Sequence, residues 1–365
     1  MLIGVLLHPY GEKKPAGLGR TIFELTKAMV EGHPENEYVV YVKDKPSVLP
    51  AFAGHNWHLE VLGGGFFWLD RGFWRAPRAD VYIFNTPILP FFFVPKNSIV
   101  IALDFAYWFF PPRNILGKIR NWLLFLYHGY SLWRAKRVVA ISEATKRDVI
   151  KLFGIPEKKI SIMYLGYKPI CAEPQEAVAL PEKFFLFVGI IKERKNVFNV
   201  VKAFREYRRT HNSHKLVVAG NGEGGYYEKI KEYVKQEGIE DAVVFFGHAN
   251  DSQLSYVYRK AEALFFPSIA EGFGMPVAEA MDCGLPVITS TTTSLPEVGG
   301  DGAVIVDPYN IGEMAEALIK ISTDHAFREQ LIYKGFEQKK KFSWQKSAEA
   351  MLMVVKKISY DVENN

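Results

Sequence analysis

Two doubly wound α/β domains, each built around a parallel β-sheet, are the fold that the sequence predicts. Strand-like apolar runs alternate with helical patterns over almost the whole chain, which is typical of parallel sheets with crossover helices. The chain has 365 residues, a length that suits two domains at roughly 100–200 residues each. Between the two series of elements, the stretch KPICAEPQEAVALPEK (168–183) lacks periodicity and holds three prolines.

The first domain is predicted over residues 1–168. Its strands are short apolar runs bounded by turn-forming residues. They are expected at Leu2–Leu7, Tyr38–Val42, Val81–Phe84, Ser98–Leu103, Val138–Ile141 and Ile160–Met163. Helical periodicity places helices at Gly19–Glu31, Leu116–Ala135 and Glu143–Phe153, and Ser142 is a good N-cap for the last of these.

A linker over 169–183 and a second domain over 184–341 follow. The same alternation of strand and helix patterns begins again there. Strands are expected at Phe184–Val188, Leu216–Ala219, Val243–Phe246, Ala263–Phe266, Val287–Thr289 and Ala303–Val306. Helices are expected at Val197–Thr210, Tyr226–Glu237, Ser252–Lys260, Pro276–Asp282 and Ile311–Ser322. Both domains should bind ligands at the carboxyl ends of their strands.

The composition is that of an ordinary globular protein, with 48% hydrophobic and 23% charged residues, and it excludes a disordered, collagen-like or coiled-coil chain. Cys171 and Cys283 lie more than a hundred residues apart. We therefore expect neither a disulfide framework nor a thiolate zinc site, and a reducing, cytosolic setting. The apolar run Leu2–Leu7 is interpreted as a buried strand and not as a signal peptide. No window reaches the roughly 18 apolar residues of a transmembrane helix.

Charge and aromatic residues are unevenly distributed. Residues 1–170 carry 22 Lys and Arg against 13 Asp and Glu, a balance of +9, whereas the rest of the chain carries 23 against 27, a balance of −4. Between Phe66 and Trp133, 20 of 68 residues are aromatic, or 29%, compared with 14% overall. A basic, aromatic-rich half suits an anionic membrane surface or nucleic acid. The alternative is an aromatic core beneath a lysine-rich surface.

The most informative stretch is FPSIAEGFGMPVAEAMDCGLP (266–286). A strand leads into Gly272, Phe273 and Gly274, and a helix with an early proline follows. The glycines let the backbone approach a ligand, and the helix N-terminus offers N–H groups to a phosphate. Glu271 and Glu279 flank this anion site, where a carboxylate is best used to accept hydrogen bonds from sugar hydroxyls. The alternative is that both are surface glutamates.

The motif E-G-F-G-M-P-x-x-E-A-M-x-C-G-x-P-V resembles the signature of the retaining glycosyltransferases of family 4, which have the GT-B fold. Further segments resemble the same family in the same order along the chain. These are AGLGR (Ala16–Arg20), Val138–Pro169, FVGIIKERKN (Phe187–Asn196), SLPEVGGDGAVIVDP (Ser294–Pro308) and FSWQKSAEAML (Phe342–Leu352). The last is similar to the closing helix of the family, so the resemblance implies that 342–365 packs back on the N-terminal domain.

The resemblance assigns roles to residues at matching positions. It implies that Glu271 binds hydroxyls of the donor sugar and that Glu279 holds the nucleotide ribose. Arg194 and Lys195 are similar to the pair that neutralises the donor diphosphate, where departure of the leaving group develops negative charge. Without the family, this Arg-Lys pair is better interpreted as a solvated turn.

Further positions are expected to line the donor site. The resemblance implies that the backbone N–H groups of Gly17 and Gly19 approach the phosphates, although tight turns also use such glycines. Asn221 and Gly222 follow one predicted strand and His248 follows the next, so that they are expected at the nucleotide pocket. For His248, an ordinary loop histidine is the alternative.

The segment IALDF departs from the family pattern. Members of the family commonly carry a histidine where this chain has Leu103, whereas the following Asp104 is retained. Asp104 is therefore either a catalytic-site residue or a turn residue at the end of a strand.

The segment NILGKIRNWLLFLYHGYSLWRAKR (114–137) has two interpretations. Trp122, Phe125, Leu126 and Trp133 can form one apolar face, with basic residues at both ends. Such a helix can lie in the interface of an anionic lipid bilayer. Alternatively, it packs on the N-terminal sheet like any other crossover helix of this fold.

The resemblance implies an enzyme that transfers a hexose from a nucleotide diphosphate sugar to an acceptor hydroxyl, with retention of configuration, by same-face displacement. GDP-mannose is the first candidate donor because KERKN and SLPEV are similar to mannosyltransferases, and a UDP-sugar is the second. The nucleotide is expected on the C-terminal domain. A lipid-linked or polysaccharide acceptor is expected on the basic N-terminal domain, at the cytoplasmic face of the cell membrane.

No metal is expected, since Arg194, Lys195 and a helix N-terminus supply the positive charge. Neither a cofactor nor a nucleic-acid partner is expected. Two other classes stay open. A sugar-nucleotide epimerase or hydrolase of the same fold would process the donor without an acceptor, and a catalytically silent subunit would keep only the nucleotide pocket. An NAD dehydrogenase is disfavoured because AGLGR lacks the spaced triple glycine of that fingerprint.

Overall fold

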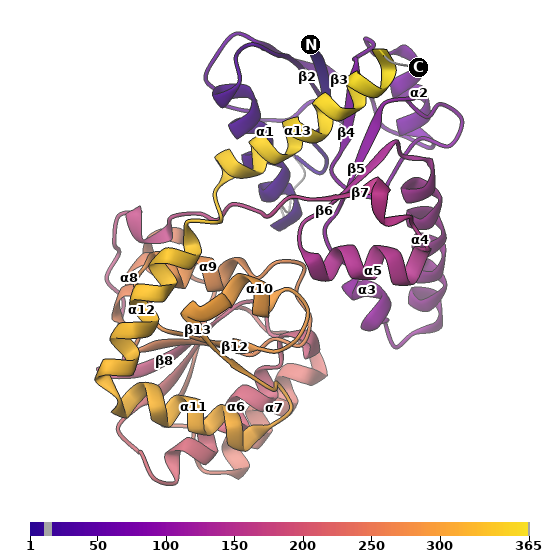
Figure 1. Cartoon of the computed structure of the whole chain (residues 1–365). Coiled ribbons are helices and arrows are strands. Elements are labelled where there is room, and N and C mark those ends of the chain that lie inside the picture. The colour runs from indigo at the N-terminus through magenta and orange to yellow at the C-terminus, as the bar shows by residue number, and fades with distance from the viewer. Residues whose placement is uncertain (11–16, 364–365) are drawn as a thin grey trace. The chain divides into compact units, whose positions relative to one another are not determined.

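The structure, a computed structural model, describes residues 1–10 and 17–363, with the side chains of 17, 18 and 361–363 left aside. Ala16, the first residue of the AGLGR motif, lies outside the described residues. The chain forms two compact units. Unit 1 consists of Met1–Gly166 and Ser343–Asn365, and unit 2 consists of Tyr167–Phe342. Figure 1 shows the elements of both units, which are described separately below.

Unit 1 is built on a parallel sheet of seven strands in the order β3-β2-β1-β4-β5-β6-β7. The strands are β1 Leu2–Leu6, β2 Glu37–Val42, β3 Trp57–Val61, β4 Val81–Phe84, β5 Ser98–Ala102, β6 Arg137–Ala140 and β7 Ile160–Ile162. The helices are α1 Gly17–Gly32, α2 Trp68–Arg75, α3 Ala106–Phe109, α4 Ile115–Arg134, α5 Glu143–Phe153, η1 Glu157–Lys159 and α13 Trp344–Glu363.

Unit 2 is built on a parallel sheet of six strands in the order β10-β9-β8-β11-β12-β13. The strands are β8 Phe184–Val188, β9 Lys215–Ala219, β10 Val243–Gly247, β11 Ala263–Phe266, β12 Val287–Ser290 and β13 Ala303–Val306. The helices are η2 Ile170–Ala172, η3 Glu193–Lys195, α6 Val197–Arg208, α7 Gly224–Gln236, α8 Asp251–Lys260, α9 Met275–Asp282, α10 Leu295–Gly299, η4 Gly300–Gly302, α11 Ile311–Thr323 and α12 His325–Lys339.

The two parallel sheets confirm the predicted doubly wound fold. Every predicted strand is present, and its ends differ from the prediction by at most one residue. The strands are easy to predict because they are buried on both faces and therefore consist of continuous apolar runs, as in Phe184–Val188. Strand β3 and the helices α2, α3, α10 and α12 were not predicted. In β3, the edge strand WHLEV, no residue is fully buried, so the apolar run that marks the other strands is lacking.

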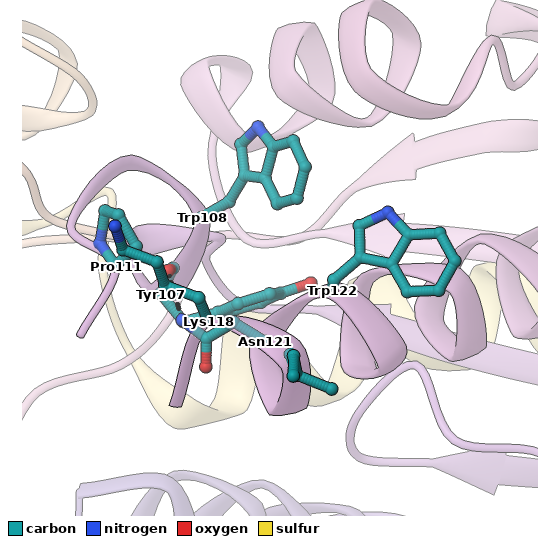
Figure 2. A pocket seen from close by; sticks show the side chains of 7 residues that line it. Tyr107, Trp108, Pro111, Lys118, Asn121 and Trp122 are labelled. Atoms are coloured by element: carbon teal, nitrogen blue, oxygen red, sulfur yellow. Dashed lines mark hydrogen bonds between the residues drawn. The ribbon is translucent and has the colours of Figure 1, made fainter. Parts of the chain in front are cut away.

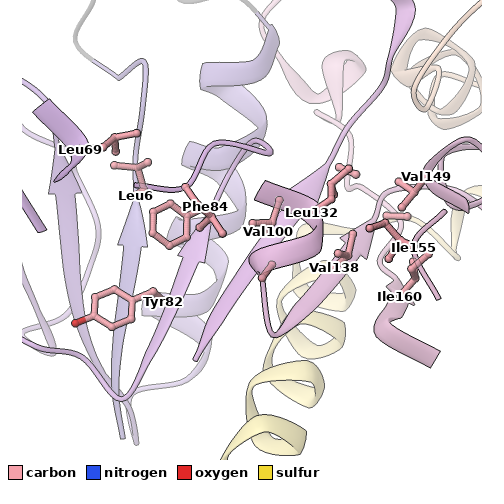
Figure 3. Close-up of a cluster of buried hydrophobic side chains, with 14 of the residues drawn as sticks. Leu6, Leu69, Tyr82, Phe84, Val100, Leu132, Val138, Val149, Ile155 and Ile160 are labelled. Carbon is pink, nitrogen blue, oxygen red and sulfur yellow. The ribbon is translucent and has the colours of Figure 1, made fainter. Parts of the chain in front are cut away.

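The core of unit 1 lies between the sheet and the helices that cover it (Figure 3). Alternate side chains of the central strands, such as Phe84 and Val100, point into one cluster. Leu132 of α4 and Val149 of α5 close this cluster from the helical side. The burial of these side chains, each worth about 1.5–3 kcal/mol, fixes both helices on the sheet.

The closing helix α13 packs against α1 of unit 1, as predicted. The Ser347 hydroxyl donates a hydrogen bond of 2.7 Å to the Tyr164 carbonyl, which ties the first turn of α13 to the end of the N-terminal segment. At Gly166, any Cβ would lie 2.4 Å from the Trp344 nitrogen, so only glycine fits where the chain leaves unit 1. Among the described residues, no helix combines the length and the apolar character needed to cross a membrane.

A disulfide joins Cys171, in η2, to Cys283, which follows the last residue of α9. The expectation that these cysteines form no disulfide framework was wrong in this respect. Sequence separation is a poor guide to spatial separation: the fold brings the two Cα atoms to 5.5 Å although 112 positions separate them. With the cysteines paired, they give no support to a reducing compartment.

Candidate functional site

Glu271, Lys195 and Arg194 come together in unit 2. Lys195 Nζ lies 2.5 Å from Glu271 Oε1, and Arg194 Nη1 lies 3.3 Å from Oε2 of the same carboxylate. The Ser268 hydroxyl donates a third hydrogen bond, of 2.7 Å, to Oε1. The two segments that the sequence analysis singled out, KERKN and EGFGMP, therefore form one cluster of charged groups.

The carboxylate of this cluster is buried and ionised. The side chain of Glu271 is 8% exposed, and that of Lys195 is 13% exposed. Burial by itself would raise the pKa of Glu271, but the charges of Lys195 and Arg194 outweigh it and hold this pKa below its ordinary value. At neutral pH the site thus presents a fixed anion beside two cations. That arrangement can accept hydrogen bonds from hydroxyls and bind phosphate at adjacent points.

The cluster stands at the point where the strand order of unit 2 reverses. From β8 the chain proceeds outward to β9 and β10, then returns to β11 on the other side of β8. Arg194 and Lys195 follow β8, and Glu271 follows β11. In an open parallel sheet, the crevice at the carboxyl ends of two such strands is where ligands bind.

Asn196, which the sequence analysis missed, fixes the Arg-Lys turn. It is buried and adopts the left-handed conformation at φ 63°, between η3 and α6. Its side-chain amide donates to the carbonyls of Pro267, at 3.0 Å, and Pro308, at 2.7 Å. The Arg194 guanidinium also donates to the Ala270 carbonyl at 2.9 Å. Asparagine is one of the few residues that tolerate this conformation, which was the available signal.

A second missed group is the run of hydroxyl residues TSTTTS at 289–294. Ser290 donates to the Ser268 carbonyl at 2.6 Å, and Ser294 donates to the Phe273 carbonyl at 2.8 Å. Thr293, at φ 52°, accepts a hydrogen bond from the Glu271 amide. These bonds satisfy the polar backbone of the 267–274 loop and hold it in one shape, so that the Glu271 carboxylate is positioned before any ligand binds.

The loop enters α9 at Gly274, as the motif predicted. Gly274 has φ 102°, and a Cβ there would lie 2.6 Å from a methyl carbon of Leu295, so glycine is required. Gly272 and Phe273 are also buried. The Phe273 ring packs edge-on against Phe342 at 5.3 Å, which makes this side chain part of the core. Its expected contact with the nucleotide can therefore come only from its backbone.

Glu279 lies one turn into α9 and accepts a hydrogen bond of 3.1 Å from the Tyr258 hydroxyl. Burial and the neighbouring carboxylate raise the pKa of Tyr258 well above its ordinary value, so that this phenol stays a donor. Tyr258, on α8, was not anticipated from the sequence. It fixes the direction in which the Glu279 carboxylate points.

Three predicted residues occupy the neighbouring strand ends of the same sheet. Asn221 and Gly222 follow β9, and His248 follows β10. Asn221 and His248 are exposed at these ends. Gly222 bridges to Ile191, which draws the segment after β9 onto the segment after β8. Asn221, Gly222 and His248 are thus arranged along the sheet edge that carries Lys195. Their contact with a nucleotide stays a prediction.

The predicted site residues of unit 1 lie at the start of α1 and just before α3. Gly17 and Gly19 lie in the first turn of α1, after β1. Asp104 is exposed, and its carboxylate accepts a hydrogen bond of 3.1 Å from the Ala106 amide at the start of α3. This is the bond that the turn interpretation requires. Within the described part of the chain, no group of three or more His, Cys, Asp or Glu side chains is arranged to hold a metal ion.

The sequence pattern of the family "Glycosyl transferases group 1" matches residues 172–338, which include every predicted residue of the unit 2 site. Among characterised proteins, the chain is similar to O-antigen chain mannosyltransferase B of Escherichia coli. The two are 28% identical over 288 residues, which is 75% of this chain and 74% of that protein.

Solved structures show the same fold. Sucrose-phosphate synthase from Thermosynechococcus elongatus matches with a TM-score of 0.75 at 16% identity, over 99% of each chain. The Anabaena protein HepE, in complex with UDP and glucose, matches with a TM-score of 0.72 at 15% identity, over 97% of this chain and 99% of that one. At these identities the likeness identifies the fold, GT-B, and nothing of the substrates.

Proposed function

Because the chain belongs to the group 1 glycosyl transferases, a retaining glycosyltransferase family with the GT-B fold, we propose that it moves a hexose from a nucleotide diphosphate sugar to a hydroxyl of a glycan or lipid-linked acceptor. The observation that carries this proposal is the Lys195–Glu271–Arg194 cluster at the strand-order reversal of unit 2. Unit 2 would bind the nucleotide sugar, and the basic, aromatic unit 1 would bind the acceptor.

The cluster suits the chemistry of a departing diphosphate. As the bond between the anomeric carbon and the phosphate oxygen breaks, negative charge grows on that oxygen, and fixed cations at Arg194 and Lys195 would stabilise it. The ionised Glu271 beside them would accept hydrogen bonds from the sugar hydroxyls and orient the ring. Glu279, held by Tyr258, would accept hydrogen bonds from the ribose.

The reaction that follows is a displacement on one face of the sugar. The acceptor oxygen forms its bond to the anomeric carbon on the side from which the phosphate leaves, and the departing phosphate oxygen takes the acceptor proton. Glu271 is already paired with two cations, which makes it a weak nucleophile and favours this route over a covalent intermediate.

GDP-mannose is the proposed donor. Its support is the similarity of the KERKN and SLPEV segments to mannosyltransferases, together with the E. coli relative, which is a mannosyltransferase. A UDP-sugar is the second candidate. Thermal-shift measurements with GDP, UDP, ADP and their sugars separate the two, because a ligand that binds the folded state raises its stability according to its affinity. A selective rise with GDP-mannose supports the proposal, whereas equal rises with all of them contradict it.

Lys195→Ala tests the cluster directly. Removal of this cation should lower the transfer rate by about 10²–10³-fold. The matched control is Lys192→Ala, three residues earlier, whose exposed side chain should leave the rate unchanged. Transfer and donor hydrolysis should be followed together. Equal transfer by both variants would exclude Lys195 from the catalytic cluster. No turnover by the unchanged protein would indicate a binding subunit, and donor consumption with no product on any acceptor would indicate a hydrolase.

A further inference from the structure

Helix α4 of unit 1 turns its apolar residues toward solvent. Leu116 is 76% exposed and Trp122 is 54% exposed, although both are large and apolar. They belong to a stripe at the spacing of one helix face, i, i+1, i+4, i+7, i+8 and i+11. We call this set the α4 stripe: Ile115, Leu116, Ile119, Trp122, Leu123 and Leu126.

The opposite face of α4 carries polar residues and is buried. Asn121 donates to the Tyr107 carbonyl at 2.7 Å, and His128 lies 2.9 Å from the Tyr107 hydroxyl. The Ser131 hydroxyl accepts a hydrogen bond of 3.0 Å from the Leu89 amide. These bonds fix the rotation of the helix, because turning the α4 stripe inward would leave three buried polar side chains without partners.

A pocket of about 570 Å³ opens on the same side, between α3 and α4 (Figure 2). Trp122 and Ile119 of the α4 stripe form part of its lining, together with Trp108 and Tyr107 from α3. Lys118 is the charged residue among those that line it. A mostly apolar hollow with one cation at its rim suits a hydrocarbon chain that ends in an anionic group.

A second exposed aromatic group adjoins α4. Phe66 and Phe92 are 83% and 80% exposed, and the Phe67 ring contacts the Phe92 ring at 5.7 Å. Phe91, the residue before Phe92, stacks on Tyr127 of α4 at 4.8 Å. Ring contacts and chain continuity thus link these side chains to α4, and such an extended apolar surface is unusual on a protein that has only water around it.

The charges around this surface are strongly one-sided. Residues 61–142 contain ten Lys and Arg against three Asp and Glu, and 105–142 contain six against none. Lys118 and Arg120, both exposed, lie on opposite flanks of the α4 stripe. Asp70, one of the three acidic residues, is buried and accepts a hydrogen bond from the Phe92 amide. An exposed apolar stripe with cations on both flanks is complementary to an anionic lipid surface.

We infer that unit 1 docks on an anionic phospholipid bilayer through the α4 stripe, with its apolar side chains at the acyl boundary and Lys118 and Arg120 among the phosphates. Aliphatic residues predominate in the α4 stripe, which favours lipid over nucleic acid, whose bases need a platform of aromatic rings. This inference goes beyond the proposed function, because it names a partner that takes no part in sugar transfer.

Vesicle flotation tests it without any nucleotide sugar, so that its outcome is independent of the proposed reaction. The protein should float with vesicles of equal parts phosphatidylglycerol and phosphatidylcholine, and should float poorly with pure phosphatidylcholine or in about 0.5 M NaCl. The double variant Trp122→Glu, Leu126→Glu should weaken binding by about a hundredfold. Lys118→Glu with Arg120→Glu should weaken it by about thirtyfold, on anionic vesicles only.

The matched control is Met353→Glu, on α13 of the same unit, where the side chain is 62% exposed. It should float like the unchanged protein, and circular dichroism should show that all variants are folded. Equal flotation of every variant would overturn the inference, as would equal binding to neutral vesicles. So would a dimer in sedimentation analysis that Trp122→Glu dissociates, or binding to single-stranded DNA in place of vesicles, because each assigns the α4 stripe to another partner.

Discussion

Helices α4 and α6 are both crossover helices of a parallel sheet, α4 between β5 and β6 and α6 between β8 and β9, yet they bury faces of different chemical character. In α6, Val201 and Phe204 are fully buried, while Lys202 and Arg205 are half-buried. In α4, three of the four buried residues, Asn121, His128 and Ser131, are polar, the fourth being Leu132, and the α4 stripe faces outward. The comparison teaches that helical periodicity defines a stripe, whereas the hydrogen-bond partners beneath the helix decide which way the stripe faces.

The largest effect expected from this comparison is on stability. Phe204→Ala should lower the free energy of unfolding of unit 2 by about 3–5 kcal/mol, because it leaves a cavity in a packed core. Trp122→Ala should change that of unit 1 by no more than about 0.5 kcal/mol, because half of the ring is already in water. Guanidinium unfolding followed by circular dichroism measures both. A Trp122→Ala cost similar to that of Phe204→Ala would mean that the α4 stripe is packed after all.

A slightly smaller difference should follow from the disulfide, which cross-links unit 2 only. Closing a loop of 112 residues restricts the unfolded chain, so Cys171→Ser with Cys283→Ser should destabilise unit 2 by about 2–4 kcal/mol. Thermal unfolding of the oxidised, reduced and double-variant proteins measures this. The transition of unit 1 should not move, and its movement by the same amount would show that the two units unfold together.

The buried polar face of α4 should make unit 1 sensitive to acid. Burial lowers the pKa of His128 to about 4, from an ordinary 6.5. In the unfolded chain this histidine takes up a proton as the pH falls through 6.5, so the stability it contributes is complete above that pH and is lost toward pH 4. Between pH 7 and pH 5 the loss should be about 2 kcal/mol.

His128→Asn, which keeps a neutral hydrogen-bonding side chain next to Tyr107, should remove this loss of unit 1 stability between pH 7 and pH 5. Urea unfolding at several pH values measures it, with unit 2 as the internal comparison. The same slope in the variant would show that other groups, such as the carboxylates near α4, carry the pH dependence.

The smallest effect is expected at Asp104. Its carboxylate accepts a hydrogen bond from the Ala106 amide in the turn before α3, and Asp104→Asn keeps an acceptor there, so that stability should change by less than about 0.5 kcal/mol. If Asp104 is a turn residue only, the transfer rate is unchanged as well. A rate that falls by about a hundredfold with intact stability would place Asp104 in the active site.

Much of the fold could be predicted because its strands are buried on both faces. Phe184–Val188 and Ala263–Phe266 stand out as uninterrupted apolar runs, and their bounds in the structure are those predicted. The edge strand β3 gave no such signal, because no residue of WHLEV is fully buried. The pairing of Cys171 with Cys283 was missed for another reason: it depends on how η2 packs near the end of α9, which no local pattern reveals.

The site was predictable only in part. A family resemblance led to Lys195 and Glu271, and the structure places their side chains in contact. The residues that hold them were missed, because Asn196 and Ser290 act on partners that lie 22 to 112 positions away. Local sequence shows that a residue can donate a hydrogen bond, but the acceptor is chosen by the tertiary fold.

The close contact between Gly166 and Trp344 makes unit 2 an insert whose two ends are neighbours. The chain departs after Gly166 and returns at Ser343, and both positions lie within unit 1. A segment with adjacent ends can be exchanged as a module without rebuilding its host. If unit 2 selects the donor as proposed, replacing 167–342 by the corresponding segment of a relative should give this protein the sugar-nucleotide preference of that relative. Unit 1, with its proposed lipid-binding face, would be unchanged.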